Sequence, residues 1–97
     1  MTRIVLEPEA EQDIADGYGW YELQRPGLGD RFLVSVERCL EAIARAPTAY
    51  RVIERDVRRA LLRTFPYGLL YRVRDDSVFV VACFHGKRNP RVWRRRL

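Results

Sequence analysis

Residues 67–85 read YGLLYRVRDDSVFVVACFH and contain two extended runs on either side of an acidic pair, Asp75 and Asp76. In the first run the side chains alternate between the two faces of a strand, and one face carries Tyr67, Leu69, Tyr71 and Val73. Within the second run, residues 77–85, the stretch 78–84 is apolar on both faces, which is typical of a central strand. A polar pair between two such runs favours a tight hairpin turn. The stretch therefore predicts an antiparallel hairpin at the centre of a sheet, with Tyr71 in the core.

The segments on either side of this hairpin complete the predicted order of elements. Residues 58–65 form a third extended run that ends before Pro66, and residues 50–56 read as a loop. Upstream, residues 4–6 favour a short strand, and apolar side chains at helical spacing predict helices from Pro8 and over residues 30–46, with a break at residues 24–30. The chain is thus expected to be one α+β domain over residues 1–97, in the order β-α-α-β-β-β. A helical hairpin covers one face of an antiparallel sheet, the other face stays free, and a short basic tail follows Pro90.

Composition excludes several classes of protein. The longest apolar runs are far shorter than the ~20 residues that cross a bilayer, and an acid at position 7 interrupts the start of the chain, so we expect a cytoplasmic protein without a membrane partner. The two cysteines, Cys39 and Cys83, lie among apolar neighbours and are interpreted as buried structural thiols. One histidine in 97 residues provides too few ligands for a metal site, and we expect neither a metal nor a cofactor.

The charges are distributed unevenly along the chain. Residues 1–50 carry five basic and nine acidic side chains, a balance of −4, whereas residues 51–97 carry thirteen basic and four acidic side chains, a balance of +9. Seventeen of the eighteen basic residues are arginine, whose planar guanidinium suits bidentate contact with carboxylate or phosphate. A bias of the genome toward arginine codons explains the identity of these residues but not their placement. The asymmetry therefore favours an anionic partner for the C-terminal half.

Two segments of this half resemble the RelE/ParE superfamily of bacterial type II toxins. Residues 58–73, RRALLRTFPYGLLYRV, contain the pattern FPY-x-x-x-Y, and residues 85–93, HGKRNPRVW, contain H-x-x-R-x-P-x-x-W. The likeness in element order runs from the opening strand to Trp93. It implies a cytoplasmic toxin that is neutralised by a cognate antitoxin with an acidic amphipathic segment, and a toxin–antitoxin pair that binds its own operator DNA.

The superfamily contains two activities. RelE-like members cleave messenger RNA on the ribosome with basic strand residues, a downstream arginine and a C-terminal tyrosine, whereas ParE-like members inhibit DNA gyrase. In this chain Arg59 and Arg88 match basic positions, but Leu61 and Gly68 stand where the ribonucleases have basic residues, and Trp93 lies near their tyrosine. Indole has no titratable proton to donate. The resemblance therefore implies a ParE-like inhibitor that acts by protein–protein contact rather than an enzyme.

Two alternatives stay open at this point. If the chain is a metal-independent ribonuclease of the ribosome and its mRNA, His85 and Arg88, with help from Arg63, are the catalytic candidates, since histidine is suited to proton transfer near neutral pH. His85 can equally cap its strand by hydrogen bonding. The third hypothesis is a non-toxic module that only binds antitoxin and DNA.

The candidate residues for contact with the target or partner share a place in the basic half of the chain. Whether Trp93 closes the core or contacts a partner is open from the sequence. The candidates are Arg59, Arg63, Arg72, Arg88, Arg91 and Trp93.

Overall fold

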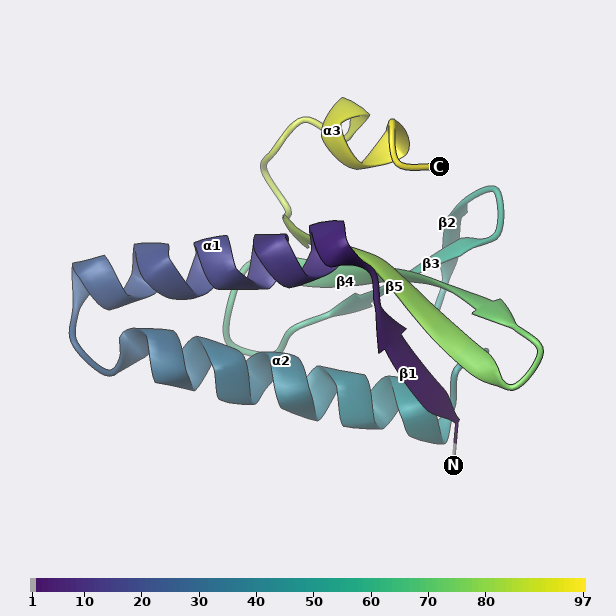
Figure 1. Cartoon of the computed structure of the whole chain (residues 1–97), viewed down its shortest axis with the longest axis horizontal. Helices are drawn as coiled ribbons and strands as arrows, with labels where there is room; N and C mark the ends of the chain where they lie inside the picture. The colour runs from purple at the N-terminus through teal and green to yellow at the C-terminus, as the bar shows by residue number, and fades with distance from the viewer. Residues whose placement is uncertain (1) are drawn as a thin grey trace.

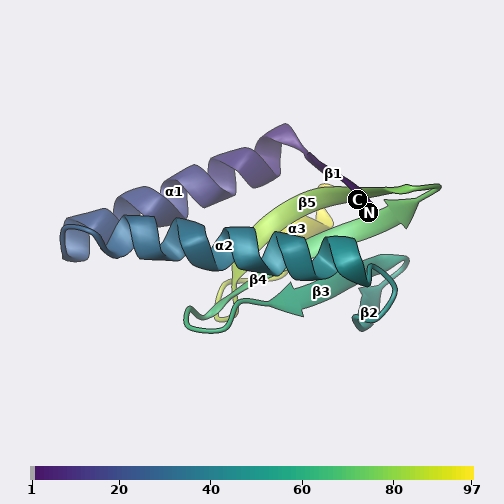
Figure 2. The ribbon, with the colours of Figure 1, turned by 90° about the horizontal axis from the view of Figure 1, so that it is seen from below.

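The computed structural model describes residues 2–97, which form a five-stranded sheet with helices on both faces (Figure 1). The elements are β1 (Arg3–Leu6), α1 (Pro8–Gln24), α2 (Leu28–Arg45), β2 (Val52–Glu54), β3 (Val57–Leu61), β4 (Tyr67–Arg74), β5 (Ser77–His85) and α3 (Arg91–Arg94). Figure 2 shows α2 in front of the sheet and α3 behind it. The expected α+β fold with an N-terminal helical hairpin is confirmed.

The sheet has the strand order β1-β5-β4-β3-β2, with β5 beside β4 as the sequence predicts. Two features differ from the expectation. β1 pairs with β5 in parallel, so the sheet is mixed rather than purely antiparallel. The segment expected as a loop contains the edge strand β2, which turns into β3 through Arg55 at a positive φ of 50°. No glycine or proline marks this turn, and the sequence pattern therefore did not reveal it.

The helical hairpin depends on close backbone contacts at two glycines. A Cβ atom at Gly17 would lie 2.7 Å from the ring of Phe32, and one at Gly29 would lie 2.8 Å from Tyr18, so larger residues at either position would separate the helices. The turn between the helices places Gly27 at φ 90°. The Glu22 carboxylate accepts hydrogen bonds from the backbone N–H groups of Gly27 and Gly29 at 3.0–3.1 Å and so satisfies donors at the start of α2. The helix begins at Leu28, two residues earlier than the sequence predicts.

The main core lies between the hairpin and the sheet. Tyr71 is fully buried there, as predicted, and its hydroxyl donates to the Pro47 carbonyl oxygen at 2.7 Å. Under the hairpin tip four rings pack with centroid distances of 4.8–6.0 Å. These rings belong to Tyr21, Phe32, Phe65 and Tyr67.

The opposite face of the sheet is not free, contrary to the expectation. Its second apolar cluster includes Leu70, Val81 and Phe84 from the sheet and Trp93 from α3. Trp93 is 6% exposed, and its side chain therefore belongs to the core. The ladder between β4 and β5 shifts register at Leu70 and Tyr71, which turns both Val81 and Ala82 toward this face.

Candidate functional site

Two strands and the turn after β5 bring several of the predicted site residues to one cavity of about 230 Å³ on the face of the sheet that α3 covers. Arg59 comes from β3, His85 ends β5, and Arg88 lies in the turn that leads to α3. Gly68 lines the same cavity, and a Cβ atom at this position would lie 3.2 Å from the Cγ atom of Arg59. Glycine therefore leaves room for the Arg59 side chain where a larger residue would displace it.

His85 is held by local contacts. Its Nδ1 atom accepts a hydrogen bond from the backbone N–H of Lys87 at 3.0 Å, and its ring packs edge to face on Tyr67 at 5.2 Å. Acceptance at Nδ1 assigns the proton of the neutral ring to Nε2. In this state Nε2 can donate a proton or a hydrogen bond but cannot accept one. The structure thus supports the expectation that His85 caps the end of its strand.

Arg88 is an exposed cation of the cavity, as is Arg59. Its guanidinium lies 5.3 Å from the centroid of the Phe84 ring, a cation–π distance. Among residues 2–97 no carboxylate forms a salt bridge with Arg88, Arg59 or Arg91. These three guanidinium groups are therefore available to an anionic partner.

Other arginines of the basic half contact carboxylates within the chain. Arg72 and Arg74 both contact the Asp56 carboxylate, with Arg72 Nε at 3.5 Å, and Arg94 pairs with Glu54. The hydrogen bond from Arg74, aided by the charge of Arg72, holds the pKa of Asp56 below its ordinary value. Arg72, which was expected to contact a partner, here shares the single Asp56 carboxylate with Arg74, so the two guanidinium groups keep a net charge of +1. This pairing was not predictable from the local pattern, because Asp56 lies in the turn between β2, which was not predicted, and β3.

The basic tail is also fixed rather than free. Arg96 binds Asp13 of α1 through two hydrogen bonds of 2.6 and 3.0 Å and donates to the Val81 carbonyl oxygen at 3.0 Å. Asp13 accepts a further hydrogen bond from the backbone N–H of Cys83 at 3.0 Å. The hydrogen bonds to Asp13 raise the pKa of Arg96. The sequence carries one signal for this contact. Asp13 lies three residues after Ala10, which is buried, and is therefore on the side of α1 that faces the protein.

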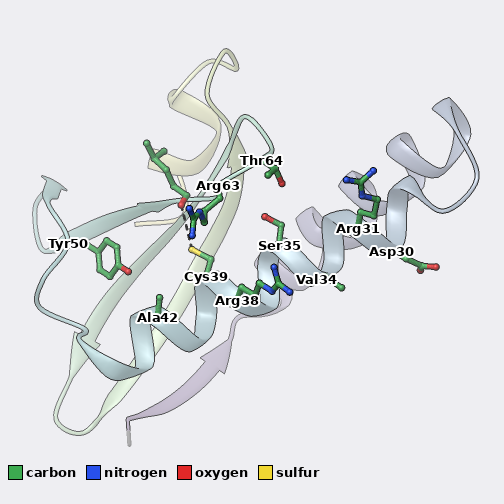
Figure 3. A pocket seen from close by; sticks show the side chains of 11 residues that line it. Asp30, Arg31, Val34, Ser35, Arg38, Cys39, Ala42, Tyr50, Arg63 and Thr64 are labelled. Carbon is green, nitrogen blue, oxygen red and sulfur yellow. Dashed lines mark hydrogen bonds between the residues drawn. The ribbon is translucent and has the colours of Figure 1, made fainter.

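A second hollow, of about 700 Å³, lies between α2 and the turn that follows β3. We call it the α2 groove. Figure 3 looks into it, with Ser35 and Cys39 of α2 facing Arg63 and Thr64. Its walls carry three arginines, namely Arg31, Arg38 and Arg63, and one acid, Asp30. Leu61 and Val34 also line it and are 67% and 45% exposed. Arg63 thus lies in this groove, away from the cavity that holds Arg88.

Three further features of the chain concern its thiols, membrane spans and metal ligands. Burial raises the pKa of the Cys39 thiol to about 11 and that of Cys83 to about 12, and both are free thiols. Within residues 2–97 no helix combines the length and the apolar character needed to cross a bilayer. The same residues contain no group of three or more histidine, cysteine, aspartate or glutamate side chains arranged to hold a metal ion.

Comparison with known protein families shows to which family the chain belongs. The model of a family described as the ParE toxin of the type II toxin-antitoxin system, parDE, matches residues 4–90. The chain belongs to the ParE toxin family. Toxin ParE2 of Mycobacterium tuberculosis, from strains CDC 1551 / Oshkosh and H37Rv, is 28% identical over 89 residues, which cover 91% of this chain and 85% of the relative.

The ParE fold is also found in a solved structure described as the chromosomal ParDE TA system from P. aeruginosa. The TM-score is 0.67 at 15% identity, over 88% of this chain and 96% of the other. This likeness concerns the fold alone. Membership of the ParE family makes the chain a type II toxin and implies a cognate antitoxin as its partner.

Proposed function

We propose that this ParE-family toxin inhibits DNA gyrase by protein–protein contact through the surface around Arg88. The observation that carries the proposal is the outer cavity, where unpaired Arg59 and Arg88 adjoin a histidine whose Nδ1 is engaged by Lys87. Such a surface binds an anionic group of a partner through charge-assisted hydrogen bonds. A neutral His85 that carries its proton on Nε2 is poorly placed to take the proton of an RNA 2′-hydroxyl.

The test is DNA supercoiling by purified gyrase with increasing amounts of the toxin. We expect supercoiled product to disappear as toxin reaches excess over gyrase, and Arg88→Ala to remove most of the inhibition without loss of folding, because Arg88 is exposed. Full supercoiling activity at saturating, folded toxin would refute the proposal.

A second candidate function, ribosome-dependent cleavage of mRNA, is favoured by one observation. Arg59, His85 and Arg88 line the same cavity, as a cation pair and a proton donor around a scissile phosphate would require. Primer extension on transcripts isolated after toxin induction separates the two functions. New 5′ ends that vanish in His85→Ala would favour cleavage, and unchanged transcripts would exclude it.

The proposed mode of neutralisation uses the α2 groove. Exposed Leu61 and Val34 offer apolar contact, and Arg31, Arg38 and Arg63 surround them with positive charge. An acidic amphipathic helix presents the complementary surface, with apolar anchors at helical spacing and carboxylates at its edges. The antitoxin segment therefore binds here, and the complex reaches operator DNA through the antitoxin.

A further inference from the structure

The edge of β5 beyond the end of β1 carries main-chain groups that no strand satisfies. β1 pairs with residues 77–80 of β5, and its last paired residue is Leu6, opposite Val80. β5 continues to His85, five residues further, without a strand on this side. Two main-chain groups of this edge are instead satisfied by side chains. The Val81 carbonyl oxygen accepts a hydrogen bond from Arg96, and the Cys83 N–H donates to Asp13.

The hydrogen bonds of Tyr67 fix the direction of the groups at His85. Tyr67 pairs with His85 across the sheet, but its own N–H donates to Phe65 and its carbonyl oxygen accepts from Leu62. Tyr67 and His85 therefore form a pair without mutual hydrogen bonds, and the main-chain groups of His85 point away from β4. Cys83 lies two residues earlier, so its N–H and carbonyl oxygen point the same way, as its bond to Asp13 confirms.

Two of these edge groups have no partner. The His85 carbonyl oxygen accepts from Arg88 N–H, and the Cys83 N–H donates to Asp13. Both the Cys83 carbonyl oxygen and the His85 N–H point away from β4, and within residues 2–97 neither has a hydrogen-bond partner. An acceptor at one residue and a donor two positions later are the pair that a single residue of a parallel strand engages with its own N–H and carbonyl oxygen.

Space for such a strand lies beside these groups. A hollow of about 640 Å³ between α1 and the end of β5 is lined by Cys83, His85, Lys87 and Trp20, and we call it the β5-edge groove. Trp20 is 56% exposed and offers an apolar surface on the helix side. Two acids of α1 also line the groove, and of these Asp13 is paired with Arg96 and Asp16 accepts a hydrogen bond from Gln12. Lys87 and Arg88 line it as well and form no salt bridge with any carboxylate of residues 2–97.

We propose that the β5-edge groove binds an extended segment of the cognate antitoxin, whose backbone pairs in parallel with Cys83 and His85 and prolongs the line of β1. This inference rests on the proposed neutralisation by an acidic antitoxin segment. Acidic side chains in the extended segment face Lys87 and Arg88, and an apolar one contacts Trp20.

Continuity with the α2 groove favours the antitoxin as the occupant. Thr64 lines the α2 groove and Pro66 lines the β5-edge groove, so that only Phe65 separates the two hollows along this turn. A segment that is helical in the first groove and extended beyond it therefore reaches the second without crossing the body of the toxin.

Amide exchange, followed by NMR in the free toxin and in the toxin–antitoxin complex, tests the inference. We expect exchange of the His85 N–H to slow by at least about tenfold in the complex, because it gains an acceptor. The Gly86 N–H, which already donates to Pro66, is the internal control and should change little. A stable complex in which the His85 N–H exchanges as fast as in free toxin would overturn the inference, as would protection by gyrase instead of antitoxin.

A pair of variants gives an independent readout. His85→Pro removes the edge N–H, whereas His85→Ala removes the imidazole and keeps the N–H. We expect antitoxin affinity to fall about tenfold for His85→Pro and about twofold or less for His85→Ala, measured by calorimetry on folded proteins. Equal affinities for the two variants would contradict strand pairing. Because this readout is antitoxin affinity, it is separate from any failure to inhibit gyrase.

Discussion

At the scale of single residues, Asp13 joins three parts of the chain. Its carboxylate binds Arg96 of the C-terminal segment and the backbone of β5 while its own residue lies in α1. The side chains of Asp13 and Arg96 are only 13% and 20% exposed, so solvent compensates little when one partner is lost. The pair satisfies the Val81 carbonyl oxygen and the Cys83 N–H, two main-chain groups of β5 just beyond the end of β1.

Asp13→Ala should therefore lower the free energy of unfolding by about 3 kcal/mol, since it leaves a partly buried guanidinium and a backbone N–H unpaired. Urea denaturation followed by circular dichroism measures the loss. Asp16→Ala is the matched control on the exposed side of α1 and should change stability by less than about 0.5 kcal/mol. Equal effects of the two substitutions would show that the Asp13 pair does not stabilise the fold.

The two thiols should be unreactive in the folded protein. Their pKa values are raised from 9.0 to about 11 for Cys39 and about 12 for Cys83, so the thiolate is scarce at pH 8.5. We expect native alkylation by iodoacetamide to be at least about tenfold slower than alkylation in urea. Because the folded-state pKa values are raised, the corresponding stabilisation is complete below pH 9 and decreases as the pH rises from 9 toward 11. Rapid alkylation of the native chain would contradict this.

At the scale of elements, α3 is a short helix held by one large side chain. Trp93 is 6% exposed and packs in the outer cluster with Phe84 and Leu70, whereas neighbouring Val92 is 40% exposed. The C-terminal segment thus completes the core of the outer sheet face. It also forms one wall of the cavity that holds Arg88.

Trp93→Ala should cost about 3 kcal/mol of stability, because a buried aromatic side chain leaves a cavity. Val92→Ala should cost less than about 1 kcal/mol, and thermal unfolding compares the two. A small effect of Trp93→Ala would mean that its ring does not pack on the sheet.

The α2 groove yields a prediction about antitoxin binding. Arg38→Glu places a negative charge in the groove, whereas Arg45→Glu makes the same change at an exposed position of α2 outside the groove. We expect at least about tenfold weaker antitoxin binding for the first and little change for the second, measured by calorimetry. Similar losses for both would move the antitoxin to another face.

The residue pattern of the sequence predicted the central strands β4 and β5, but it did not predict β2 at the edge of the sheet or the packing of α3. The alternation in β4, the doubly apolar β5 and the acidic turn at Asp75 are local signals, and the structure confirms them. β2 was missed because it is three residues long and turns at Arg55 without glycine. The packing of α3 on the sheet was not predicted. Arginines flank Trp93, and a segment rich in charged residues is expected to be exposed to solvent.

The same limits apply to the candidate site. Arg59 and His85 lie on β3 and β5, which flank β4, and Arg88 follows β5 in the next turn, so all three line one cavity. Arg63 lies elsewhere because β3 ends at Leu61, and Arg72 shares with Arg74 an acid, Asp56, from a turn that was not predicted. Contacts between segments far apart in the sequence leave no periodic signal.

At the scale of the whole molecule, the charge asymmetry persists after internal pairing. Of the twelve arginines in residues 51–97, four contact carboxylates, namely Arg72, Arg74, Arg94 and Arg96, and the other eight contact none within residues 2–97. Only Arg96 is paired with an acid of the first half. Eight arginines of this half therefore keep their positive charge free of carboxylate contacts, in line with the proposed binding of an acidic antitoxin segment.

The measurement that tests the central claim most directly is supercoiling of relaxed plasmid by gyrase with the toxin, its Arg88→Ala variant and the toxin–antitoxin complex side by side. We predict that only the unbound, unaltered toxin abolishes supercoiling. Full supercoiling in the presence of excess folded toxin, or equal inhibition by the antitoxin complex, would contradict the account.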